Sequence, residues 1–224
     1  TYNASTNNME SSITYKALAE VATGTLPTDA QLGKKTQESY FTGAQGEEKT
    51  SYSKEFTGAS GAEAVSATTV YDYNTDDSMK SSVSYKQSIG ITYNANRTVT
   101  LATTSPLPVK KTATYYTGAR GEEQSLYSQS YYQGTFDKTT IYTYNASTNN
   151  MESSITYKAL EEVATGVLPT AAQLGKKTQE SYFIGAQGEE RTSYSKEFTG
   201  VKGAETVSAT TVYDYNADDS MKSS

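Results

Sequence analysis

Two stretches of the sequence place a serine three residues before a lysine, the S-x-x-K spacing that serine–lysine chemistry uses. Both read SYSK, at residues 51–54 and 193–196. The chemistry requires serine and lysine on one face of a helical turn, so that the lysine can take the serine proton. The Tyr, Ser and Thr residues around both stretches favour a β-strand, on which residues three apart point to opposite faces. We therefore expect no catalysis from this pattern.

The segment after residue 71 carries oxygen-bearing side chains at alternate positions, as calcium-binding loops do. An EF-hand would also need Gly at its sixth position and Glu at its twelfth, where this chain has Asp77 and Val83. We favour a hairpin turn in which Asn and Asp side chains bond to the backbone, and we keep calcium as the alternative cofactor. Its ligands would be Asp72, Asn74 and Asp76 with the copies Asp214, Asn216 and Asp218.

A short glycine-bearing stretch, GAQG at residues 43–46, is similar to part of a phosphate-binding loop. Two glutamates, Glu47 and Glu48, follow it at once and would repel a phosphate, and no Gly-Lys-Ser/Thr follows. Glycine pairs of this kind recur between Thr- and Tyr-rich runs, which is typical of β-hairpin turns. We therefore interpret these stretches as turns.

The elements that would carry these residues belong to long internal repeats. Residues 1–82 align without a gap to residues 143–224, and only nine positions differ. A Tyr-Asn pair also recurs every 71 residues, starting at position 2, and divides the chain into successive units. These are unit A at 1–72, unit B at 73–143, a second A-type unit at 144–214, and the start of another B-type unit at 215–224. We expect the chain to be a window on a longer array.

The composition limits both the core and the chemistry. Leu, Ile, Val and Phe together make up about 14% of the chain, too little for an ordinary globular core. Twenty tyrosines and many threonines favour a thin β-sheet structure in which Tyr rings supply most of the buried surface. The absence of His and Cys removes the commonest general base and all thiolate chemistry. A net charge of −6 with scattered cations argues against nucleic-acid binding, and no apolar run is long enough to span a membrane.

Each unit is expected to contain four antiparallel strands. In unit A they are predicted at residues 11–18, 35–42, 48–57 and 64–74, with a longer excursion between the first two. That excursion is expected to hold a helical turn near residues 28–32, whereas the corresponding segment of unit B looks extended. The predicted fold is therefore an all-β, tandem-repeat antiparallel meander of about 71 residues per unit, built as a solenoid, ribbon or tube.

Aromatic residues at alternate strand positions predict a stripe along one face of this sheet. Such a stripe can form the seam between layers of an assembly, which we favour, or a platform on which sugar rings stack. The stripe consists of Tyr52, Phe56, Tyr71, Tyr73, Tyr194, Phe198, Tyr213 and Tyr215.

Residues 68–86 (TTVYDYNTDDSMKSSVSYK) and 139–158 (TTIYTYNASTNNMESSITYK) resemble the Tyr-Asp repeats of Rhs-type and teneurin-like proteins. The resemblance implies a secreted or surface-exposed β scaffold that forms part of a large shell. The long, nearly identical repeats rich in Thr, Tyr and Ser also resemble giant tandem-repeat surface and filament proteins of bacteria.

From these features we predict a structural protein without catalytic activity, which forms an extracellular or cell-surface filament, sheath or stalk. Its expected partners are further copies of itself or further repeats of a longer chain, and no nucleic acid. Two alternatives remain: a repeat adhesin that binds glycans through the Tyr face or the excursion loops, and a segment of an Rhs-like β shell.

Overall fold

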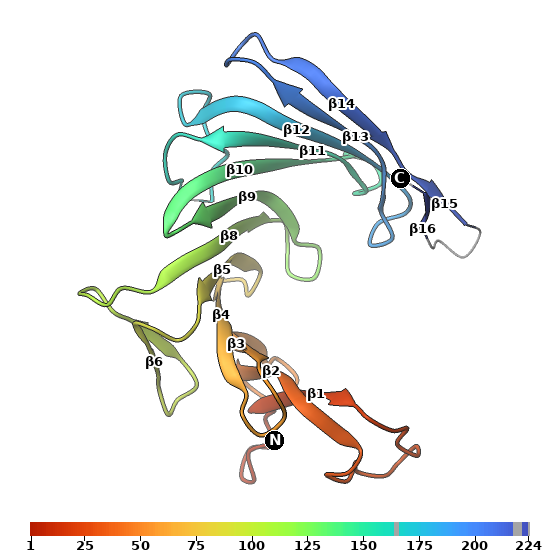
Figure 1. Ribbon diagram of the computed structural model, residues 1–224. Coiled ribbons are helices and arrows are strands. Elements are labelled where there is room, and N and C mark those ends of the chain that lie inside the picture. Colours follow the sequence, from red (N-terminus) through yellow and green to blue (C-terminus); the bar gives the residue numbers. More distant parts are fainter. Residues whose placement is uncertain (164–165, 217–220, 224) are drawn as a thin grey trace. The chain divides into compact units, whose positions relative to one another are not determined.

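The computed structural model describes residues 1–163, 166–216 and 221–223, and it confirms the predicted all-β class (Figure 1). No helix forms among these residues, so none is long and apolar enough to span a membrane. The strands are β1 (Ser11–Ala17), β2 (Leu32–Thr42), β3 (Lys49–Thr57), β4 (Ala64–Tyr73), β5 (Met79–Lys86), β6 (Ile91–Tyr93), β7 (Val99–Leu101), β8 (Val109–Thr117), β9 (Gln124–Tyr132), β10 (Thr135–Tyr144), β11 (Met151–Ala159), β12 (Leu174–Ile184), β13 (Arg191–Thr199), β14 (Thr206–Val212), β15 (Asp214–Tyr215) and β16 (Met221–Ser223).

The main sheet is an antiparallel meander of twelve strands, in the order β1-β2-β3-β4-β5-β8-β9-β10-β11-β12-β13-β14. The short hairpins β6–β7 and β15–β16 form two further sheets of two strands each. The chain also divides into two compact parts that differ from the sequence repeats A and B. We call them the first unit, residues 1–73 with 82–111, and the second unit, residues 74–81 with 112–224. Each unit is described by itself below.

Strand pairing is the same in the two long copies of the sequence. Ser11 of β1 lies opposite Tyr40 of β2, and Ser153 of β11 lies opposite Tyr182 of β12. The register shifts within these two pairs also fall at corresponding positions. The substitutions that separate the copies therefore leave the pairing of these strands unchanged, and the four strands predicted in unit A correspond to β1–β4.

In the excursion between β1 and β2, the residues expected to hold a helical turn, 28–32, form two overlapping hydrogen-bonded turns and no helix. The amide of Gln31 donates to Thr28 O at 2.9 Å, and the side-chain oxygen of Gln31 accepts from both the amide and the hydroxyl of Thr28. The amide of Leu32 donates in turn to Asp29 O at 3.3 Å, and the chain then enters β2. The corresponding segment of unit B is extended, as expected, and forms the β6–β7 hairpin.

The core is thin and made largely of tyrosine rings and hydroxyl groups. Tyr127 and Gln129 of β9 are completely enclosed, and so are Thr68 of β4 and Thr139 of β10. Because aliphatic residues are scarce, Tyr rings supply the buried area and every enclosed polar group requires a hydrogen-bond partner. The partners of these groups define the candidate sites.

Candidate functional site

Five hairpin turns share a six-residue pattern, G-x-x-G-x-E. The sequence alone predicted turns at the glycines but did not point to the glutamate. The first glycine has a φ between 107° and 124° and the second a φ between 79° and 83°. A Cβ on the first glycine would lie 2.5–2.9 Å from the carbonyl oxygen four residues later, so this position must be glycine. The glutamates that end the pattern are Glu48, Glu63, Glu123, Glu190 and Glu205.

Each of these glutamates accepts hydrogen bonds from two backbone amides, one in its own turn and one in an earlier part of the chain. Glu190 accepts from the amide of Gly188 in its own turn at 2.9 Å and from the amide of Met151 at 3.0 Å. Met151 begins β11, so the carboxylate reaches past the end of the intervening strand β12. Glu48 and Glu123 make the same contacts to Met9 and Met79, at 2.9 and 3.0 Å.

The other two glutamates, Glu63 and Glu205, make the corresponding contacts at the opposite ends of the strands. Glu63 accepts from the amides of Lys35 and Gly61, both at 3.0 Å, and Glu205 accepts from the amide of Lys177 at 2.9 Å. Hydrogen bonds from backbone amides lower the pKa of all five carboxyl groups. The charged form is therefore stabilised by the fold, which is the opposite of what a general acid requires.

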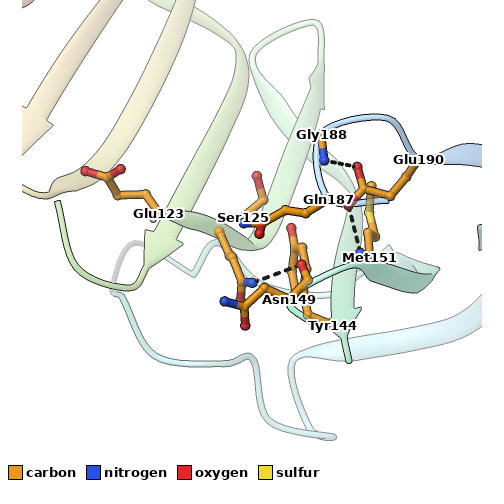
Figure 2. Close-up of a pocket in the computed structure, with 9 residues that line it drawn as sticks. Glu123, Ser125, Tyr144, Asn149, Met151, Gln187, Gly188 and Glu190 are labelled. Carbon is orange, nitrogen blue, oxygen red and sulfur yellow. Dashed lines mark hydrogen bonds between the residues drawn. The ribbon is translucent and has the colours of Figure 1, made fainter. Parts of the chain in front are cut away.

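Two of these turns border a hollow of about 260 Å³ in the second unit, shown in Figure 2. Its wall includes Glu123 and Glu190 from the turns, and Tyr144 from the end of β10. Burial raises the pKa of Tyr144. The Glu190 carboxylate in this wall holds the amides of Met151 and Gly188, so its visible role is to join the strand ends.

A second cluster, which we call the tyrosine stack, lies on one face of the first unit. Tyr40 and Tyr52 stack with ring centroids 4.5 Å apart, and Tyr93 of the β6–β7 hairpin packs against Tyr52 at 5.3 Å. The Tyr93 hydroxyl lies 2.7 Å from the hydroxyl of Thr68. Because the rings of Tyr40 and Tyr93 pack against it, Tyr52 is only 2% exposed. The extended excursion of unit B therefore covers the sheet that precedes it in the sequence.

Lysine and glutamate side chains complete the tyrosine stack. The amine of Lys54 lies 4.0 Å from the centre of the Tyr93 ring and 3.8 Å from the carboxylate of Glu38. Burial lowers the pKa of Lys54. Burial also raises the pKa of Tyr52 to about 12, with smaller contributions from electrostatic repulsion by Tyr93 and Glu38. Lys54 is the lysine of the first S-x-x-K stretch, and its surroundings are these rings and this carboxylate.

The second unit contains a corresponding cluster with different partners. Tyr115 and Tyr127 stack at 4.8 Å, and the Tyr127 hydroxyl donates to the carbonyl oxygen of Val163 at 3.1 Å. Here the covering segment is the excursion between β11 and β12. Gln129 stands where the first unit has Lys54, and its side chain binds both the amide of Val163 and the carbonyl of Glu161.

The eight aromatic residues predicted as one stripe lie on two faces of the sheet, so the prediction of a single face was wrong. Tyr52 pairs with Val70 across β3 and β4, and paired residues point to the same side. Tyr71 follows Val70 directly and so points to the other side, where its hydroxyl lies 3.5 Å from Ser53 Oγ. Because Tyr52 lies opposite Val70 and not opposite Tyr71, the aromatic residues of β3 and β4 lie on opposite faces of the sheet. This register cannot be read from the sequence of one strand alone.

The remaining members of the predicted stripe make local contacts. Phe56 and Phe198 each lie under a lysine amine, at 4.0 and 3.9 Å from the ring centre. The hydroxyl groups of Tyr73 and Tyr215 donate to the carbonyl oxygens of Thr50 and Thr192. Tyr194 stacks on Tyr182 at 4.5 Å, and the backbone amide of Tyr213 donates to Ser193 O.

The predicted calcium residues form the turn that we favoured. Asn74 Nδ2 donates to Ser78 Oγ, while Asp76 accepts from both the amide and the hydroxyl of Ser78. Asp72 accepts from the amide of Tyr73 at 3.1 Å. Of the copies, Asp214 and Asn216 lie in and beside β15, whereas Asp218 is outside the described residues. Within the described ranges, no three Asp, Glu, His or Cys residues gather as metal ligands.

A comparison with models of known protein families and with curated protein sequences finds no match to this chain.

Proposed function

We propose that this chain is a structural repeat protein that assembles into an extracellular or cell-surface filament, sheath or stalk. One observation supports the proposal above the others: the turn glutamates recur at the same spacing in the sequence repeats and make the same contacts between strands. Glu48 and Glu190 lie 142 residues apart, and each ties the same two kinds of backbone amide. Selection for a scaffold accounts for such repetition, because each unit then meets an equivalent neighbour.

The surroundings of the chemically competent side chains also favour a structural role. Lys54 faces Glu38 and three tyrosine rings, and the turn glutamates accept backbone hydrogen bonds in their charged form. A nucleophile requires a free general base beside it. We therefore propose that the protein is not an enzyme and that its partners are further copies or further repeats.

Electron microscopy of the source material tests this function directly. Filaments with an axial period matching the 71- or 142-residue sequence repeat are the expected result. Closed particles without axial periodicity would favour the shell alternative, and monomers that bind a glycan array would favour the adhesin. Stoichiometric labelling of Ser51 or Ser193 by a serine-reactive probe would contradict the absence of catalysis.

A further inference from the structure

A row of three side chains runs across neighbouring strands in each sequence repeat. In unit A, Lys54 of β3 lies opposite Glu38 of β2 and Thr68 of β4. The second A-type unit repeats this row with Glu180, Lys196 and Thr210. Unit B has in its place Ala113, Gln129 and Thr139. A row centred on lysine, which we call the lysine row, thus alternates along the chain with a glutamine row.

The glutamine row binds the backbone of the excursion that covers it, residues 160–173. Gln129 is only 1% exposed, and its side-chain oxygen accepts from the amide of Val163 at 2.8 Å. Its side-chain nitrogen donates to the carbonyl oxygen of Glu161 and to Thr139 Oγ1, both at 3.0 Å. The glutamine therefore supplies an acceptor and a donor to the backbone of this A-type excursion.

The lysine row of unit A binds an aromatic ring. Its cover is the excursion of unit B, residues 87–108, which contains the β6–β7 hairpin. The centre of the Tyr93 ring lies 4.0 Å from Lys54 Nζ, and the Tyr93 hydroxyl lies 2.7 Å from Thr68 Oγ1. The face of the ring attracts the ammonium group, and the Glu38 carboxylate lies beside it at 3.8 Å. This B-type excursion therefore meets a cation with a ring.

An exchange of the two covers would leave buried polar groups without partners. An A-type excursion on the lysine row would point the amide that Gln129 now accepts toward Lys54, which has only donors. The acceptor of that row, Glu38, already accepts from the Lys35 amine and the Tyr40 hydroxyl. A B-type excursion on the glutamine row would place a ring over Gln129, whose amide would lose both backbone partners. Each such loss destabilises the folded state.

We propose that Lys54 and Gln129 determine which excursion covers each face, a B-type excursion for a lysine row and an A-type excursion for a glutamine row. Each excursion then fits a neighbour of the other type and is rejected by a unit of its own type, through the polar groups left unpaired. Nearly identical tandem repeats are prone to misassembly with one another, so alternation protects the order of the repeats. This inference goes beyond the proposed function, since it concerns the order of the units and not the assembly that they form.

Two exchanges in the second unit of the full chain test this pairing. Ala113→Glu together with Gln129→Lys converts the glutamine row into a lysine row. Replacing residues 159–175 by the sequence of residues 87–109 converts the excursion from A-type to B-type. The junctions match, because a lysine precedes and Lys-Lys-Thr follows both segments.

Urea unfolding of the four combinations shows whether row and excursion act as a pair. Either exchange alone should lower the unfolding midpoint of the second unit and reduce its ratio of folded to unfolded chain by about tenfold or more. The two exchanges together should recover most of this loss, because a lysine row then lies under a ring. A doubly exchanged chain that shows the sum of the two losses, or that does not fold, would overturn the proposal.

Hydrogen exchange at the Val163 amide tests the glutamine row without a grafted segment. Gln129→Lys removes the acceptor of this amide, so its exchange should accelerate about tenfold or more relative to the paired amides of β10 and β11. Gln179→Lys is the matched control, since Gln179 is an exposed glutamine of the same unit, and it should leave the amide protected. A Val163 amide that stays protected in Gln129→Lys would show that a lysine row accepts an A-type excursion, which contradicts the proposal.

Discussion

The carboxylate of Glu190 holds the backbone amide of Met151 at 3.0 Å, although 39 residues and the whole of β12 separate them. The same contact joins Glu48 to Met9 and Glu123 to Met79. A side chain that closes one hairpin turn thus also anchors the start of a strand two places away. In a sheet with few aliphatic residues, such charged hydrogen bonds link neighbouring hairpins at their ends.

Glu190→Gln should destabilise the second unit by about 0.5–1 kcal/mol, because a neutral amide accepts backbone hydrogen bonds less strongly and the site is partly open to solvent. The midpoint of urea unfolding, followed by circular dichroism, measures this loss. Glu189→Gln is the matched control, since Glu189 is the exposed neighbouring residue of the same turn. Equal losses in both variants would contradict the bridging role.

Stability should fall as the pH drops below about 4.5. The folded state lowers the pKa of Glu48, Glu123 and Glu190 below the ordinary value of 4.5, through hydrogen bonds from backbone amides. These groups stabilise the fold fully above their unfolded pKa, and the contribution is lost as pH falls through their folded pKa. Urea midpoints between pH 7 and pH 3 measure the slope. Replacing all three by Gln should flatten it, and an unchanged slope would assign acid sensitivity to other carboxylates.

The two glycines of one turn should differ in their tolerance of alanine. Gly185 has a φ of 124°, and a Cβ there would lie 2.5 Å from the carbonyl oxygen of Glu189. Gly188 has a φ of 81° with open space around it, so Gly188→Ala costs only the left-handed conformation, about 1–2 kcal/mol. Gly185→Ala should cost more, since the backbone itself must move. Thermal unfolding of both variants compares them, and equal losses would contradict this account.

Removing the Tyr93 ring should uncover the tyrosine stack. Tyr93→Ala should destabilise the first unit by about 3 kcal/mol, and Tyr93→Phe by about 1 kcal/mol through loss of the Thr68 hydrogen bond. Burial holds the pKa of Tyr52 at about 12, so Tyr93→Ala should move it toward the ordinary value of 10. NMR titration of labelled tyrosine follows this shift. A Tyr52 pKa that stays near 12 would show that Tyr93 is not its cover.

Strand identity and strand limits were largely determined by the sequence alone. The predicted strand at 48–57 is observed at Lys49–Thr57, and the predicted strand at 64–74 at Ala64–Tyr73. The physical reason is local: alternating Tyr and Thr residues favour the pleated backbone, and paired glycines supply the positive φ angles of the turns. These preferences act within a few residues and need no distant partner.

The tertiary structure alone decided which side chains are enclosed and which face each one occupies. Tyr52 and Tyr194 lie in the same SYSK sequence, yet Tyr52 is buried beneath Tyr93 while Tyr194 stays half-buried. Likewise, the partner of Glu190 is an amide 39 residues away, which turn composition cannot identify. Burial and register depend on the neighbouring strand and on the segment that folds over it, so the same sequence has different surroundings in different places.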